Sequence, residues 1–394
     1  MKRFAFILVF LLALSSIVLA QSNTIDNVLE EIEKNNTGLA AYQKQQEAQS
    51  LAHKTGIYPD NPEFEYAWFS GSPSTLGNKT GISVRQHFSF PTTYFHKNRI
   101  AHARNDQLQL EYEKHRSDLL LEARFICLEL VYYNAMSTLL DQRLQHAQRI
   151  ADAYSRMLET GETNIIEHNK ARLNLLDLQK QDERISIEKK ALLQQLTALN
   201  GGIEISFSDA NFEPVTISGE FDNWYAQAEK NNPVLQNIKQ EIEINRKEEK
   251  LQRASNLPGF NVGYVSELLT HEKFRGFAIG ISIPLWENKN TLQHAKARTS
   301  AMQSVEHDQQ LQYYNFLKTQ HSRATSLQES AMEYRNLVQT IDNTELLATA
   351  WTEGEISLTG YLLELSYLYQ SMDKILEMEL ELHQTLAVMN QYMD

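Results

Sequence analysis

Two stretches of the sequence contain neither proline nor glycine and have the same length. Residues 92–160 and 285–353 are each 69 residues long; each follows a Ser-x-Pro sequence and ends at a Gly-Glu pair. Because proline and glycine are the residues least favourable in a helix interior, tracts this long without them favour continuous helices. At 1.5 Å per residue, each helix would be on the order of 100 Å long. A globular enzyme has little use for that length.

The two tracts indicate an internal duplication. Pro91 and Pro284 are 193 residues apart, and so are Gly161 and Gly354. A repeated order at a constant offset is typical of a duplicated unit. Each copy is predicted to contain a helix, two short strands, a very long helix, a Gly-Glu hairpin and a returning helix. We expect a signal peptide at 1–20, a first repeat at 21–200, a connector at 201–222 and a second repeat at 223–394.

The first 20 residues have the pattern of a secretory signal. Lys2 and Arg3 precede an apolar run over residues 4–14, and Val-Leu-Ala at 18–20 forms a small-residue cleavage site. An uncleaved membrane anchor is the alternative, but the apolar run is short. No later stretch approaches the roughly 20 apolar residues of a spanning helix. If the exported chain enters a membrane, a closed β-barrel is the structure left to it.

Charge and cysteine content exclude several functions. The formal net charge is −13, which disfavours nucleic acid as a partner. Cys127 is the only cysteine, so no disulfide can form within the chain, and its apolar neighbours indicate a buried side chain rather than a reactive thiol.

Four short segments alternate between apolar and polar or small residues, with a period of two. The apolar members are Phe64, Tyr66 and Trp68; Ile82, Val84, Phe88 and Phe90; Phe260, Val262 and Tyr264; and Phe277, Ile279, Ile281 and Ile283. This pattern is typical of transmembrane barrel strands, although a soluble hairpin packed on a helix would share it. Four strands are too few to close a barrel, so closure would require several protomers.

The long tracts carry a narrow apolar stripe with helical spacing. In the first tract the stripe comprises Met136, Leu140, Leu144, Ala147, Ala151, Tyr154 and Leu158. So thin a stripe on so long a helix favours side-by-side packing of helices rather than burial in one compact core.

Over essentially the whole mature chain, this order of elements resembles the TolC family of outer-membrane efflux ducts. The segments that carry the resemblance are 228–235 (AEKNNPVL), the strand ends 89–91 and 282–284, and the hairpins 161–164 and 354–357. The residues after the hairpins, 167–171 and 361–364, are more similar to the heavy-metal efflux branch than to the drug-efflux branch. Two positions depart from the family pattern: Thr37 stands where proline is usual, and Gly360 where the best-known members have a constricting aspartate.

The resemblance implies a mainly α, duplicated protomer with a small β part. Three protomers would contribute four strands each to a 12-stranded barrel in the outer membrane, and long antiparallel helices would form an α-barrel in the periplasm. The duct would be passive and joined through a periplasmic adaptor protein to an inner-membrane pump of the RND type. The hairpins would form the periplasmic mouth. The candidate mouth and gate residues are Gly161, Glu162, Glu167, His168, Gly354, Glu355, Gly360 and Glu364.

The sequence offers little for catalysis or for a cofactor. It has no nucleophile elbow, no phosphate-binding glycine loop and no paired cysteines. The histidines never stand three or four residues apart, so no helix presents a His pair to a metal. His168 is the one histidine that a threefold axis could turn into a metal-binding or titrating ring, while a solvated surface histidine is the ordinary interpretation. We predict neither an enzyme nor a bound cofactor.

Two further interpretations remain open. A periplasmic adaptor would explain the export signal and the long helices, and so would an exported coiled coil. Rings of Glu at a constriction favour cations, which would suit metal export, but most carboxylates of long helices are solvated. The substrate stays undetermined among metals, drugs and secreted proteins.

Overall fold

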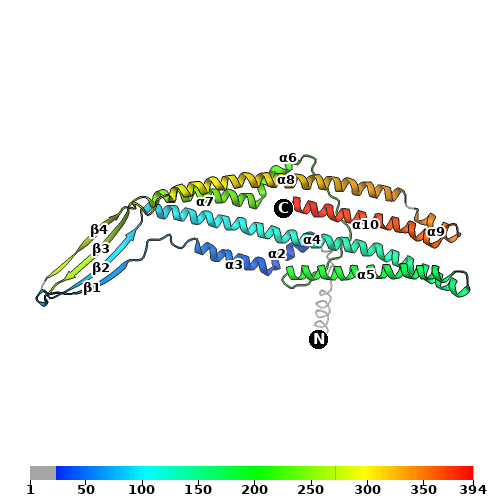
Figure 1. Ribbon diagram of the computed structural model, residues 1–394, viewed down its shortest axis with the longest axis horizontal. Coiled ribbons are helices and arrows are strands. Elements are labelled where there is room, and N and C mark those ends of the chain that lie inside the picture. The colour runs from blue at the N-terminus through cyan, green and yellow to red at the C-terminus, as the bar shows by residue number, and fades with distance from the viewer. Residues whose placement is uncertain (1–23, 271, 342, 394) are drawn as a thin grey trace, which may run out of the picture. The chain divides into compact units, whose positions relative to one another are not determined.

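The computed structural model describes residues 24–393 except 271 and 342 (Figure 1). The predicted signal peptide at 1–20 lies outside the described residues. The helices are α2 (Ile25–Asn35), α3 (Thr37–Ala52), α4 (Pro91–Thr160), α5 (Ile165–Leu199), α6 (Phe221–Asn231), α7 (Pro233–Ser255), α8 (Thr291–Thr340), α9 (Thr344–Thr352) and α10 (Leu358–Met389). The strands are β1 (Glu63–Ser70), β2 (Asn78–Phe88), β3 (Gly259–Leu268) and β4 (Lys273–Ser282).

The chain folds into two compact units, each assembled from separate parts of the sequence. Unit 1 comprises Met1–Leu39, Arg116–Trp224 and Phe316–Asp394, and unit 2 comprises Ala40–His115 and Tyr225–Asn315. All four strands belong to unit 2, whereas both hairpins belong to unit 1. None of the described helices combines the length and apolarity needed to cross a membrane.

The first proline- and glycine-free tract is one helix, as predicted, but the second is not. α4 runs through all of residues 92–160, whereas the second tract is divided between α8 and the short helix α9. Asn343 occupies the N-cap position of α9. Asparagine favours caps over helix interiors because its side chain competes for nearby backbone groups. The prediction of an uninterrupted second helix was therefore wrong, because it considered only proline and glycine as interruptions.

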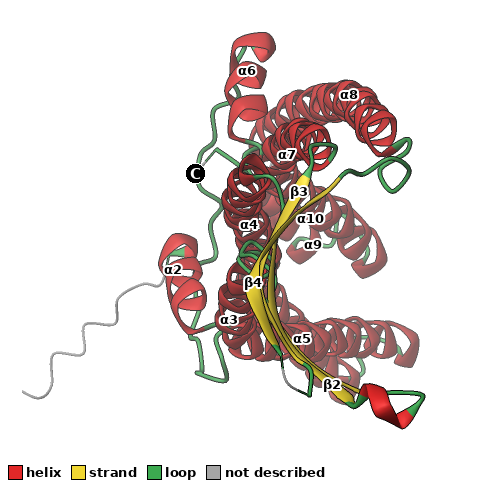
Figure 2. Cartoon of the chain, turned by 90° about the vertical axis from the view of Figure 1, so that its left-hand side faces the viewer, coloured by secondary structure: helices red, strands yellow, loops and turns green. Residues whose placement is uncertain are grey.

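The four strands form one antiparallel sheet (Figure 2), in the order β1-β2-β3-β4 (Figure 1). Phe64 pairs with Val84, Val84 with Tyr264, and Tyr264 with Phe277, so one apolar row crosses all four strands. These side chains are exposed on the chain; the exposed fraction of Phe277 is 84%, and that of Ile279 is 80%. The predicted alternation is confirmed, and no layer of the described residues covers its apolar face.

The opposite face of the sheet carries polar and small side chains. Arg85 lies 3.7 Å from Glu65, and Lys79 lies 2.8 Å from Glu267. Gly263 provides room for Arg85, because a β-carbon at residue 263 would lie 3.1 Å from the arginine Cγ. The sheet is therefore amphipathic, with ion pairs on one face and aromatic and aliphatic side chains on the other.

Unit 1 has its main hydrophobic core where α2, α4, α5 and the connector meet. Its largest fully buried side chains include Ile32, Leu130 and Leu196. Cys127 lies in the same core with no exposed surface, and burial raises the pKa of its thiol to about 12. The sequence-based expectation of a buried, unreactive cysteine is confirmed. The predicted stripe of α4 is also buried in part, through Leu140, Ala147, Ala151 and Tyr154.

The junction between α5 and the connector is fixed by a buried amide. Asn200 has no exposed surface; its Nδ2 donates to Glu31, and its Oδ1 accepts from Asn35. The next residue, Gly201, has a φ of 66°, and a β-carbon there would lie 2.5 Å from the Asn35 carbonyl oxygen. Only glycine fits this close approach.

The substitution Gly201→Ala is therefore expected to lower the free energy of unfolding by about 2 kcal/mol or more. The left-handed conformation costs an alanine roughly 1 kcal/mol, and the clash with Asn35 adds to this. Gly202→Ala is the matched control, because φ is 88° there but no atom lies within 4 Å of the added β-carbon. Denaturant unfolding of both variants would measure the difference. Equal losses of stability would contradict the proposed clash.

Candidate functional site: the two hairpin tips

The two Gly-Glu sequences form the same turn. Gly161 and Gly354 have φ values of 78° and 77°, the left-handed conformation that follows many helix ends. After Gly161, two backbone N–H groups donate to the Met157 carbonyl, at 2.8 and 3.2 Å. After Gly354, two donate to the Ala350 carbonyl, at 2.9 and 3.3 Å. The hairpins thus reverse the chain with matching hydrogen bonds.

Each returning helix begins at a capping side chain. Asn164 Oδ1 accepts from the backbone N–H groups of residues 166 and 167, at 2.9 and 3.1 Å. Ser357 Oγ accepts from the N–H of Gly360, at 3.2 Å. Asn and Ser are among the preferred N-cap residues because their oxygens satisfy free N–H groups of the first turn. The turn and the cap together fix where α5 and α10 start.

The two hairpins pack against each other within unit 1. A buried cluster joins residues of three helices: Ile150, Ala151 and Tyr154 from α4, Ala171 from α5, and Leu358, Tyr361 and Leu365 from α10. Lys170 of α5 also donates to the Thr359 hydroxyl of α10, at 2.8 Å. The tips of the two hairpins therefore form one site rather than two separate ones.

Three stacked aromatic rings hold the second hairpin against α4. Trp351 lies between Tyr361 and Tyr154, with ring centroids 5.0 and 6.3 Å away and interplanar angles of 12° in both cases. Tyr361 has no exposed surface, and its hydroxyl lies 2.9 Å from His146 Nε2. Burial, with a smaller contribution from Arg149, lowers the pKa of His146. The neutral imidazole can therefore accept the phenol hydrogen at neutral pH.

A buried ion pair lies further along α4 and α10. The Arg143 side chain is only 5% exposed, and its guanidinium donates to both carboxylate oxygens of Asp373, at 2.7 and 3.2 Å. The same group donates to the Tyr369 carbonyl, at 3.3 Å, and lies 4.4 Å from the centre of the Tyr369 ring. This bidentate geometry is the stronger form of an arginine–carboxylate ion pair.

The structure separates the predicted mouth residues into two groups. Gly161, Glu162, Gly354 and Glu355 lie exposed at the turns, and Glu364 is exposed on α10. The other predicted residues, Glu167, His168 and Gly360, are partly buried in the first turns of α5 and α10.

Glu167 and His168 each have one polar atom engaged and one without a partner. Glu167 Oε1 accepts from Lys170 at 2.9 Å, and His168 Nε2 lies 3.3 Å from Ser155 Oγ. Glu167 Oε2 and His168 Nδ1 are buried without a hydrogen bond. Within the described part of the chain, no three His, Cys, Asp or Glu side chains are grouped as metal ligands. A metal ring at His168 stays a prediction.

The protonation of His146 should make the hairpin contact sensitive to pH. Because its pKa is lowered in the folded state, its stabilising contribution is complete above the unfolded-state pKa of about 6.5 and is lost as the pH falls from there through the lower pKa of the folded state. We expect the thermal midpoint of His146→Gln to fall less than that of the wild type between pH 7.5 and 5.5. Partly buried His383 also has a lowered pKa, but it is present in both proteins, so its contribution cancels in the comparison. Identical pH profiles would contradict this role for His146.

Comparison with known proteins identifies the fold. No protein-family model matches the sequence, and no curated protein matches it. One similar structure is CusC, whose crystal structures describe the conformational changes that accompany its folding and transmembrane channel formation. Its TM-score is 0.77 at 12% identity, and the match covers 94% of this chain and 92% of CusC. The outer-membrane channel CmeC of Campylobacter jejuni has a TM-score of 0.73 at 14% identity, covering 93% of this chain and 85% of CmeC. The outer-membrane protein VceC of Vibrio cholerae has a TM-score of 0.73 at 11% identity, covering 93% of this chain and 95% of VceC.

These likenesses establish the TolC-like protomer fold, as predicted from the repeated motifs. The similar structures are channel proteins rather than enzymes. At identities of 11–14%, the likeness concerns the fold alone.

Proposed function

We propose that this chain is one subunit of a trimeric outer-membrane channel that conducts substrates passively out of the periplasm. The observation that carries the proposal is the exposed apolar face of the four-stranded sheet, a surface that a water-soluble protein would cover. Three such sheets would supply the twelve strands of a closed barrel, with the apolar row toward lipid and the ion pairs toward the lumen. The fold shared with outer-membrane channels supports the same assignment.

The hairpin tips are proposed as the periplasmic mouth of the channel. Glu162 and Glu355 lie next to the two turning glycines and are exposed. In a trimer, each would be repeated three times around the axis, and rings of carboxylates favour cations over anions. Glu364 is a third candidate for such a ring. We therefore propose heavy-metal cations as the cargo. Selection against other substrates would be made by the pump rather than by the channel.

The proposed partners are a periplasmic adaptor protein and an inner-membrane pump of the RND type. The exposed turns supply a terminal surface on which an adaptor could dock. We predict neither a cofactor nor catalytic activity for the channel itself, so the energy for export would come from the pump.

Two measurements test the assignment. Outer-membrane fractions should contain an SDS-resistant trimer that dissociates on heating, and the purified protein should produce discrete conductance steps in a planar bilayer. Glu355→Gln is expected to reduce the preference for cations, whereas Glu204→Gln in the connector should leave it unchanged. A water-soluble monomer without conductance would contradict the channel and favour a periplasmic adaptor.

A further inference from the structure

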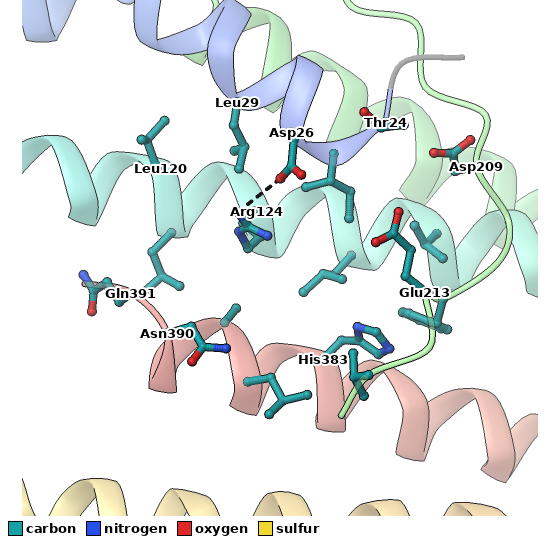
Figure 3. Close-up of a pocket in the computed structure, with 18 of the residues that line it drawn as sticks. Thr24, Asp26, Leu29, Leu120, Arg124, Asp209, Glu213, His383, Asn390 and Gln391 are labelled. Carbon is teal, nitrogen blue, oxygen red and sulfur yellow. Dashed lines mark hydrogen bonds and ion pairs between the residues drawn. The ribbon is translucent and has the colours of Figure 1, made fainter. Parts of the chain in front are cut away.

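A cavity of about 680 Å³ lies in unit 1, lined by α2, α4, the connector and the end of α10 and partly open to solvent (Figure 3). Small-molecule sites typically occupy roughly 300–1,000 Å³. Thr24, Asp209 and Gln391 mark its borders on α2, the connector and the C-terminal end of the chain. The cavity belongs to neither the hairpin tips nor the sheet, and the function proposed above does not use it.

The floor of the cavity is apolar. Leu29 of α2, Leu120 of α4 and Leu386 of α10 line it. On the connector side, the ring of Phe212 stacks on His383 of α10, with centroids 4.9 Å apart and an interplanar angle of 28°. A ligand seated here would cover aliphatic and aromatic surface, which is the usual source of binding energy in such sites.

The two guanidinium groups of the cavity are already neutralised. Arg116 donates to both carboxylate oxygens of Glu33, at 2.5 and 2.7 Å. Arg124 lies 3.3 Å from Asp26, and this contact is the dashed line in Figure 3. No lysine stands among the described residues that line the cavity. An anionic ligand would therefore have to displace an existing ion pair.

The remaining charged groups of the cavity are carboxylates. Glu30, Asp209 and Glu213 line it, and none of their side chains has an ion pair within the described residues. His383 does not offset them at neutral pH, because burial lowers the pKa of its imidazole. Among the described residues, three carboxylates thus border an apolar floor without a compensating cation.

We propose that this cavity binds a hydrophobic organic cation. The apolar body of the ligand would lie on Leu29, Leu120 and the Phe212 ring, and its positive charge would face Glu30, Asp209 and Glu213. The combination of an apolar floor with uncompensated carboxylates discriminates against anions and against small, strongly hydrated cations. The cavity lining contains no residue of the hairpin tips or of the strands, so this proposal does not rest on the proposed channel function.

Tetraphenylphosphonium and tetraphenylborate test the proposal, because the two ions have nearly the same size and shape but opposite charge. Isothermal titration of the purified full-length protein in detergent should show saturable binding of the phosphonium and none of the borate. The double substitution Glu30→Gln with Glu213→Gln should weaken phosphonium binding at least about tenfold, as expected for removing charges near a protein surface. Glu204→Gln is the matched control, since Glu204 lies on the connector outside the cavity lining.

A second variant separates the cavity from general surface charge. Leu120→Trp fills the floor without changing any charge, and it should also abolish phosphonium binding, with circular dichroism verifying that the helices persist. Equal binding by wild type and both cavity variants would overturn the proposal, and so would equal affinity for the borate. Absence of phosphonium binding in the assembled protein would overturn it as well.

Discussion

We expect the substitution Asp373→Ala to destabilise the packing of α10 on α4 by about 3–5 kcal/mol. Removing the carboxylate leaves the guanidinium of Arg143 buried without its counter-charge, and an unpaired buried charge costs far more than a lost surface contact. The Tyr369 carbonyl and ring remain as partners of the arginine, but neither carries a formal negative charge. Unit 1 should stay folded while the second hairpin loosens.

Hydrogen exchange of the α10 amides measures this effect, since local opening would raise exchange there before it rises in the core around Leu130. The matched control is Glu381→Ala, which breaks the contact of Glu381 with Arg323 on α8, where both side chains are about half exposed. Loss of this exposed ion pair should lower the free energy of unfolding by less than about 1 kcal/mol. Equal exchange in the two variants would show that burial of Arg143 does not matter. Arg143→Met with Asp373→Leu should recover most of the lost protection.

The second large effect is expected at the apolar face of the sheet. In the proposed barrel, Ile279→Arg places a charge toward lipid, which costs roughly 2–4 kcal/mol near the middle of a bilayer. Because each of the three protomers carries the substitution, every trimer would incur this insertion cost three times. The heat-dissociable trimer in outer-membrane fractions should therefore be strongly depleted.

The matched control is Gly276→Arg on the same strand. Gly276 lies on the opposite face of the sheet, paired with Val265, and a β-carbon there would meet no atom within 4 Å. This arginine should leave the trimer intact and alter its conductance. Equal depletion by the two substitutions would contradict the assignment of the two faces. Equal tolerance would contradict contact with lipid.

The features that the sequence predicts well are those with a local or periodic signal. The alternation around Phe277 and Ile279 predicts an apolar face because side chains in a strand point to opposite sides at every second residue. Gly161 and Gly354 predict the turns because a left-handed residue after a helix is most often glycine. The division between α8 and α9 was missed because neither proline nor glycine marks it. The signal that could have found it is the Asn343-Thr344 pair, which favours a helix start.

The contacts that join the hairpins have no such signal. Arg143 and Asp373 are 230 residues apart, and His146 and Tyr361 are 215 apart. Each looks like an ordinary helix residue in the sequence, and only the packing of α10 on α4 brings them together. Tyr361 belongs to the segment 361–364 that follows the second hairpin, but nothing in the surrounding sequence indicated a buried ring stacked on Trp351. The exposed positions of Glu162 and Glu355 could be predicted because both residues follow the turning glycines, whereas their role at a channel mouth stays a prediction.

The burial of Cys127 makes the chain a ready background for thiol labelling. A thiol with no exposed surface and a pKa near 12 carries almost no thiolate at neutral pH, and the thiolate is the species that reacts with maleimides. A cysteine introduced by Glu355→Cys or Ile279→Cys would therefore be the only reactive one, without removal of the native residue from its core. Spin or fluorescent probes could then be placed one at a time on a hairpin tip or on the sheet, and distances between protomers of the proposed trimer could be measured in membrane preparations.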